Sequence, residues 1–238
     1  MSRILANAPH LQRLRPKLCF HYLFVSLLLL IVLPPHMEGV IGVAITEAML
    51  SLVMLSSLYL VVEQKRSLYV GIALFLPAMF LSWNEVYIGQ QFAHYVPAAA
   101  NIVFFGFVSI QIFRYLIKQL HPNTEMVLAA TSLYLILGVL WAFIYAALEL
   151  KYPGSFNLGA RIDSGTFSEL LSDMVYFSFV TLTTLGYGDI SPQNSFSESW
   201  VVLEAVLGQF YVAIVLARIL GLYVARELDE ESNGSDEN

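Results

Sequence analysis

Charged residues are scarce in this sequence. Only 13% of the 238 residues are Asp, Glu, Lys or Arg, whereas 58% are hydrophobic. Soluble domains carry about one quarter charged residues, because a folded chain needs polar side chains to cover its surface in water. The composition therefore indicates an integral membrane protein and excludes an ordinary cytosolic enzyme.

Three further features are missing. The single cysteine, Cys19, cannot form an intrachain disulfide, so no disulfide framework supports the fold. Basic residues are not in surplus, since 12 Lys and Arg stand against 18 Asp and Glu, and we expect no nucleic-acid partner. The five histidines show no ligand spacing and no Gly-rich phosphate loop occurs, so we expect no metal centre and no cofactor.

Six apolar stretches run along the sequence, and they lie at residues 18–33, 39–62, 68–83, 96–117, 126–148 and 200–225. Most of them reach the length of about 20 residues that a helix needs to cross a bilayer, whereas the third is short and contains Pro77. The first follows a basic segment, as a secretory signal peptide would. It lacks a small-residue cleavage site, so we interpret it as an uncleaved membrane helix.

Loop charges support six membrane helices. With both termini in the cytoplasm, ten of the twelve basic residues lie on the cytoplasmic side, and only Lys151 and Arg161 lie outside. Cytoplasmic loops of membrane proteins are enriched in Lys and Arg, so this distribution favours cytoplasmic termini. The missing cleavage site and the absence of extracellular disulfides fit a bacterial inner membrane.

The apolar stretches divide the chain into four parts. Residues 1–17 form a basic cytoplasmic N-terminus, 18–120 a four-helix transmembrane domain, and 121–225 a second membrane domain. Residues 226–238 form a tail that is acidic and lacks aromatic residues. Such a composition predicts disorder.

The segment between the last two apolar stretches is unusual. Residues 170–184 are apolar and rich in hydroxyl groups but too short to cross a membrane, and potential capping boxes lie at 166–169 and 195–198. A helix that enters the membrane without crossing it must return as non-helical backbone, which is tolerated only beside protein or water. Gly186 and Gly188 occupy alternate positions of this return, where left-handed backbone would turn successive carbonyls the same way.

Residues 181–189, TLTTLGYGD, resemble the selectivity-filter signature of potassium channels, with Leu185 where valine is usual. The surrounding residues resemble bacterial members that have one pore loop per subunit. The resemblance implies an all-α membrane protein with a four-helix transmembrane bundle and a two-helix pore domain, which contains a re-entrant pore helix and the filter. It also implies a homotetramer in a lipid bilayer that conducts potassium ions passively, and 121–225 is then the pore domain.

The resemblance also assigns roles to single residues. Potassium would bind at the carbonyls of Thr184, Leu185, Gly186 and Tyr187 and at the Thr184 hydroxyl, with Gly188 completing the filter. Filter support would come from Asp189, Tyr176, Thr183 and Glu204. The family often has tryptophans where this chain has Tyr176 and Phe177, and it sometimes has a glutamate at the position of Val180. The bracing of the filter is therefore an open question.

Two residues of the last helix allow alternatives. Glu204 is an acid in an apolar run, so it could accept hydrogen bonds from Ser178 or Thr181, make a contact between subunits, or line the ion path. Gly208 matches the hinge of the inner helix in the family, but it could equally be a small residue that permits close helix packing.

The four-helix domain lacks a ladder of positive charges. No cation lies between Val96 and Phe113, and Arg114 and Lys118 stand at the inner end of the fourth stretch. A voltage sensor needs several charges that cross the field, so this domain resembles one in helix count alone. Glu47, in the second stretch, is interpreted as a solvated acid at the membrane interface.

The connection between the fourth and fifth stretches is short. Residues 118–125 include His121 and Pro122, which interrupt the helical pattern, and Asn123 or Thr124 can cap the next helix. This linker predicts that each four-helix domain packs beside the pore helices of its own subunit. The competing interpretation of the whole chain is a transporter or a non-conducting membrane scaffold that retains a pore-like loop.

Overall fold

The computed structural model describes residues 9–33, 39–60, 65–88, 95–120, 122–159 and 167–235. Nearly all of this described chain is helical. The helices are α1 (Pro9–Val32), α2 (Gly39–Leu60), α3 (Lys65–Ile88), α4 (Tyr95–Lys118), α5 (Thr124–Lys151), α6 (Phe167–Leu182) and α7 (Ser195–Ser235). Two short strands, β1 (Phe156–Asn157) and β2 (Ser191–Pro192), pair antiparallel.

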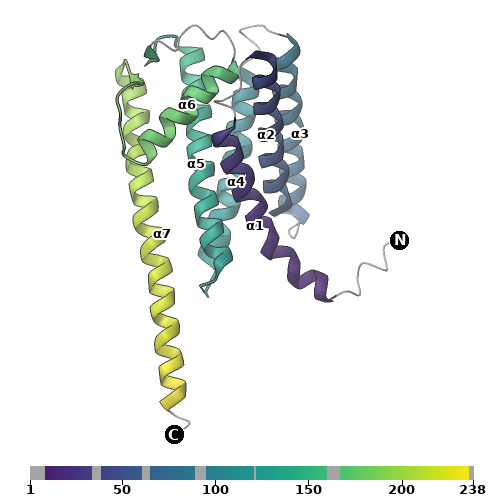
Figure 1. Cartoon of the computed structure of the whole chain (residues 1–238), viewed down its shortest axis with the longest axis vertical. Coiled ribbons are helices and arrows are strands. Elements are labelled where there is room, and N and C mark those ends of the chain that lie inside the picture. Colours follow the sequence, from purple (N-terminus) through teal and green to yellow (C-terminus); the bar gives the residue numbers. More distant parts are fainter. Residues whose placement is uncertain are drawn as a thin grey trace, which may run out of the picture.

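Five of these helices, α2, α3, α4, α5 and α7, are long and apolar enough to cross a membrane, and α1 contains the shorter apolar stretch Phe20–Val32. Figure 1 shows α2 to α5 side by side, with α6 oblique beside α5 and α7 at one edge of the molecule. The expected all-α membrane fold is confirmed. The protein is a multi-pass integral membrane protein.

Three helices differ from the expected bounds. α1 begins at Pro9 instead of residue 18, and α3 runs over 24 residues with Pro77 inside it. A proline is tolerated in a membrane helix when neighbouring groups satisfy the carbonyl it leaves free. α7 continues to Ser235, so the prediction of disorder was wrong for residues 226–235. Residues such as Arg226, Glu227 and Leu228 favour helix, and they extend α7 beyond its apolar part.

α4 packs along α5 of the same chain. Their side chains meet where Phe105 and Phe143 stack, with ring centroids 5.8 Å apart. The connection between them is short. The Asn123 side chain caps α5 by accepting a hydrogen bond from the Met126 amide at 2.8 Å, so the helix begins at Thr124. Within this chain α4 therefore lies against α5, which is the packing that the short linker predicts.

The lower part of α7 is attached to the end of α4. The Arg218 guanidinium donates to three backbone carbonyls there, those of Leu116, Ile117 and Gln119, at 3.2, 2.7 and 3.0 Å. The last carbonyls of a helix have no partners within the helix, and its C-terminus carries partial negative charge. A cation at this point is favourable on both counts, so Arg218 ties the last helix to the four-helix domain.

Crosslinking tests this packing. In a background with Cys19→Ser, a short bis-maleimide should join Phe105→Cys to Phe143→Cys within one chain, because these side chains face each other across α4 and α5. The product should run as a monomer on a denaturing gel, and the two single-cysteine variants serve as controls. Dimers to tetramers without an intrachain product would contradict the packing.

The interpretation of Glu47 as a solvated acid at the membrane interface was wrong. Its side chain is only 3% exposed, and one carboxyl oxygen, Oε2, has no hydrogen-bond partner among the residues that the structure describes. Close by on α2, Ser51 donates to the Glu47 carbonyl at 2.8 Å and accepts from the Trp83 indole at 3.0 Å. The packing of neighbouring helices on α2 has removed from solvent a residue that was expected at the interface.

Candidate functional site

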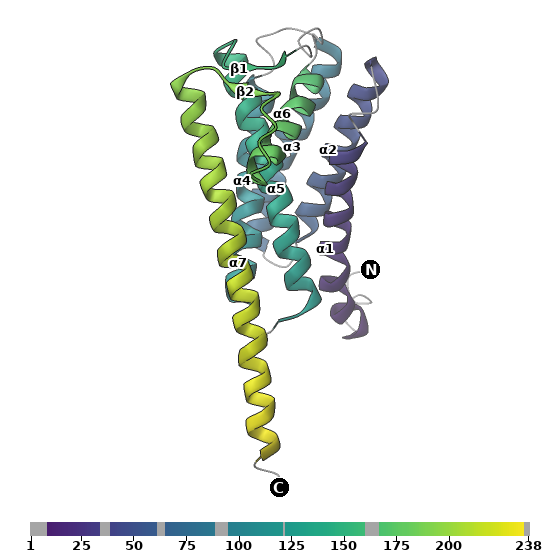
Figure 2. The ribbon, with the colours of Figure 1, turned by 60° about the vertical axis from the view of Figure 1, so that its left-hand side comes forward.

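The site is built where the chain turns back after α6. Sixteen residues are too few for this helix to span a bilayer. After Leu182 the chain turns back as non-helical backbone between α6 and α7, and we call residues 183–189 the return strand (Figure 2). Strand β2 follows this return, and it pairs with β1 in the loop after α5. The turn therefore lies between helices on two sides and is tied at its outer end.

The backbone of the return alternates in handedness. Thr184, Gly186 and Gly188 have φ values of 60°, 56° and 78°, whereas Leu185 and Tyr187 between them do not have positive φ. The sequence identified the two glycines but not Thr184, which continues the same alternation by one step. Alternation of this kind turns successive carbonyls to one side of the strand.

In the return strand, backbone amides at its start are hydrogen-bonded, whereas a row of backbone carbonyls has no donor in the described part of the chain. The amides of Thr184, Leu185 and Gly186 donate into α6, to the carbonyl of Thr181 at 2.9 Å and to that of Val180 at 2.9 and 3.3 Å. No donor among the described residues bonds to the carbonyls of residues 184–188. A row of unpaired carbonyls on one side of a strand can replace the hydration shell of a cation.

The outer end of the return is braced by a hydroxyl group. Tyr176 on α6 donates to the Asp189 carboxylate at 2.8 Å, which is the contact implied by the resemblance. Phe177 cannot donate, and its ring instead lies in an aromatic cluster with Tyr145 and Phe156, at centroid distances of 5.3 and 5.5 Å. One hydrogen bond and one apolar contact thus stand where the family often has two tryptophans.

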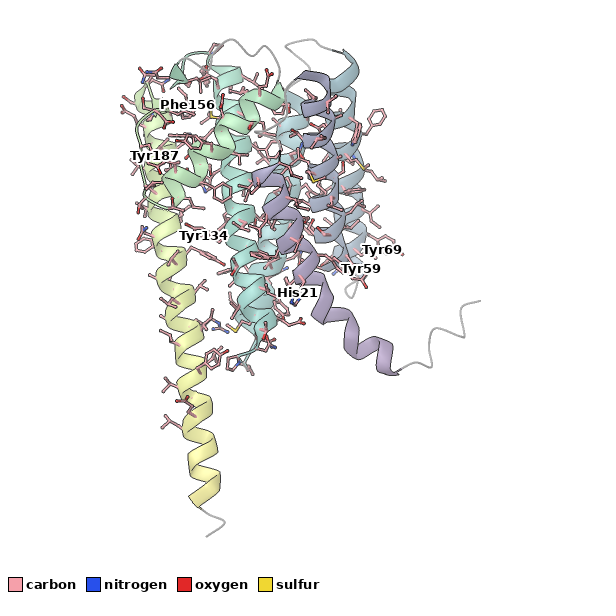
Figure 3. The ribbon with its side chains drawn as sticks, in the orientation of Figure 1. His21, Tyr59, Tyr69, Tyr134, Phe156 and Tyr187 are labelled. Carbon is pink, nitrogen blue, oxygen red and sulfur yellow. The ribbon has the colours of Figure 1, made fainter. Side chains whose placement is uncertain are left out.

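The inner end of the return is held by tyrosines that the sequence did not indicate. Tyr134 on α5 donates to the Leu182 carbonyl at 3.1 Å, and Tyr211 on α7 donates to the Ala130 carbonyl at 2.6 Å. The two rings lie 5.7 Å apart. Figure 3 shows Tyr134 extending from α5 below α6, while Tyr187 lies beside the upper part of α7. The Thr183 hydroxyl donates to the Phe179 carbonyl four residues earlier, so this side chain bonds within the end of α6.

Gly208 provides close packing of α7 against the end of α6. A Cβ added at this position would lie 2.8 Å from the Leu182 side chain and 2.9 Å from the Leu182 carbonyl oxygen. α7 is one continuous helix through this point. The structure therefore supports the packing alternative for Gly208.

Glu204 joins three helices. Its side chain is fully buried, with one carboxyl oxygen 2.5 Å from the Ser178 hydroxyl on α6 and the other 2.5 Å from the Tyr145 hydroxyl on α5. Ser178 also contacts the Gly138 carbonyl on α5 at 2.8 Å. Of the roles considered for Glu204, bracing behind the return strand is the one that this geometry supports.

Comparison with known proteins places this site in a family. A family described as "Ion channel" matches residues 130–225, which include α6, the return strand and most of α7. Protein LctB of Bacillus caldotenax is 30% identical over 101 residues, which cover 42% of this chain and 72% of LctB. The chain belongs to this ion channel family. An ion channel is not an enzyme.

Other relatives are potassium channels. Two pore potassium channel a of Oryza sativa subsp. japonica is 29% identical over 112 residues, 47% of this chain and 28% of that protein. The inward rectifier potassium channel Kirbac3.1 of Paramagnetospirillum magnetotacticum is 31% identical over 93 residues, 37% of this chain and 26% of that protein. The chain thus spans only about a quarter of the length of these two relatives. No solved structure gave a significant match.

In this channel family member, the return strand is uncovered on one side. Every residue from Thr183 to Asp189 is exposed, and the side chains of Leu185 and Tyr187 are 55% and 67% exposed. Large apolar side chains at such positions are usually covered by a partner. A single chain therefore presents one exposed strand, which does not by itself enclose a path for ions.

Proposed function

We propose that this protein is one subunit of a potassium-selective channel that conducts potassium passively across a lipid bilayer without a cofactor. The observation that carries the proposal is the return strand itself: its amides are bonded into α6, and its carbonyls at 184–188 are free of donors from the described chain. The proposed potassium sites are the carbonyls of Thr184, Leu185, Gly186 and Tyr187, together with the Thr184 hydroxyl. Gly188 completes this filter.

The proposed assembly is a homotetramer. Potassium filters are built from four equivalent carbonyl strands, and this chain supplies one. The exposed side chains of Leu185 and Tyr187 are the surfaces that neighbouring subunits would cover. The proposed type is the bacterial six-helix channel in an inner membrane with cytoplasmic termini, and support comes from the loop charges and from the similarity to a Bacillus protein.

Flux through purified protein tests the proposal. After reconstitution in liposomes, the protein should take up rubidium or potassium down a gradient far faster than sodium, and crosslinking should end at a tetramer. A transporter would instead show saturating, coupled exchange, and a scaffold would show no flux. Equal sodium and potassium permeability would contradict the filter assignment.

Weak voltage dependence is expected of the open probability. No positively charged residue lies between Val96 and Phe113 of α4, while Arg114 and Lys118 are exposed near its end. Each charge that crosses the field contributes about 2.3 kcal/mol per 100 mV, so a helix without such charges senses little. Planar bilayer recordings from −100 to +100 mV measure this, and charge movement equal to about three or four gating charges per subunit would contradict it.

A further inference from the structure

α7 is attached to its own subunit along a single face. Glu204, Tyr211 and Arg218 are spaced seven residues apart, and they contact α5 and α6, α5 alone, and α4 respectively. Seven residues are nearly two full turns of an α-helix, so the three side chains lie in one row. The row therefore marks the face of α7 that packs on its own subunit, and the opposite face points away from that subunit.

Gln209 lies on the opposite face. At about 100° per residue, its side chain points about 140–180° away from the row of Glu204, Tyr211 and Arg218. Among residues 200–217 it is the one exposed side chain with a polar group. Its amide makes no hydrogen bond with the described part of the chain. An amide without a hydrogen-bond partner has an unfavourable free energy in the hydrocarbon of a membrane, so it requires water or another polar partner.

The depth of Gln209 is fixed by its neighbour. Gly208 packs on the carbonyl of Leu182, the last residue of α6, which precedes the filter residue Thr184 by two positions. Gln209 therefore lies at the level of the inner end of the filter, on the side that faces away from its own subunit. A polar side chain at this depth is not stable against lipid, so in the proposed tetramer this is the side turned to the water-filled ion path.

We infer that Gln209 is a cation-binding residue of the conduction path: four Gln209 amides line a water-filled cavity directly beneath the innermost filter site. This inference rests on the proposed tetrameric channel. The amide oxygens are hard ligands of the kind that hydrated potassium accepts, and the other exposed side chains of α7 among residues 200–217 are apolar. Gln209 thus sets how tightly the pore holds cations that arrive from the Arg218 side of the membrane.

Thiol modification tests the position of the side chain. In the Cys19→Ser background, Gln209→Cys is compared with Phe210→Cys, which is also exposed and at the same depth but about 100° around the helix. A cationic methanethiosulfonate applied from the Arg218 side should stop most potassium current through Gln209→Cys and leave Phe210→Cys conducting. Mass spectrometry of protein in liposomes measures the modification independently of current. The inference is overturned if position 209 is not modified, or if both positions react equally.

Charge substitution tests the binding role. Gln209→Glu would place four carboxylates on the cavity, and barium or magnesium applied from the Arg218 side should block it at least about tenfold more tightly than the wild type. Gln209→Leu should weaken this block relative to the wild type. Unaltered block in Gln209→Glu would overturn the binding role. A wild type that conducts no potassium would instead overturn the proposed function itself.

Discussion

Gly186→Ala is expected to abolish potassium-selective flux while the proposed tetramer still assembles. Gly186 has a φ of 56°, and no heavy atom lies within 4 Å of a Cβ added there. The substitution therefore introduces no clash within the chain, and its cost is that of left-handed backbone, about 1–2 kcal/mol for each subunit. Return to ordinary backbone would turn a carbonyl out of the row that the potassium sites need.

The measurement is rubidium and sodium flux in liposomes, with crosslinking to count subunits. Gly106→Ala is the matched control, because Gly106 on α4 also has open space around an added Cβ but does not have positive φ. Gly106→Ala should conduct like the wild type. Wild-type selectivity in Gly186→Ala would show that the left-handed backbone at this position is not required.

The return strand was visible in the sequence because its determinants are consecutive. A short apolar helix, two alternate glycines and an acid next to them lie within one segment, and Tyr176 is only 13 residues from its partner Asp189. The pairing of Glu204 with Ser178 was one of the alternatives that the sequence offered, since an acid in an apolar helix needs a donor.

The other hydrogen bonds that hold α6 and α7 could not be predicted for a physical reason. Tyr134, Tyr211 and Arg218 all donate to backbone carbonyls, at sequence separations of 48, 81 and about 100 residues. Every residue has a backbone carbonyl, so no side-chain pattern marks the acceptor. Only the packing of the helices decides which carbonyl is reached.

Glu47 was mispredicted for a related reason. Its depth was judged along its own helix, whereas its burial depends on the neighbouring helices. The Tyr145 hydroxyl was missed as a partner of Glu204 because a tyrosine in an apolar helix is more often a packing residue. The packing of α5 on α6 and α7 turns this hydroxyl inward.

Glu204→Ala is expected to destabilise the pore domain by about 2–4 kcal/mol. The change leaves a cavity between α5, α6 and α7, and it removes the acceptor of the buried Tyr145 hydroxyl. An unsatisfied buried donor carries its full desolvation cost. Thermal unfolding in detergent, followed by tryptophan fluorescence, measures the loss as a lower midpoint temperature.

Glu204→Gln separates hydrogen bonding from charge. A glutamine oxygen can accept from Tyr145, and its amide group can donate to the Ser178 oxygen while the Ser178 proton goes to the Gly138 carbonyl. The Tyr145 hydroxyl, the Ser178 hydroxyl and the glutamine oxygen then each keep a partner, so this variant should lie within about 1 kcal/mol of the wild type. If Glu204→Gln is as unstable as Glu204→Ala, the site requires an ionised carboxylate. If it is as stable as the wild type, a neutral group is sufficient to join α7 to the helix that supports the filter.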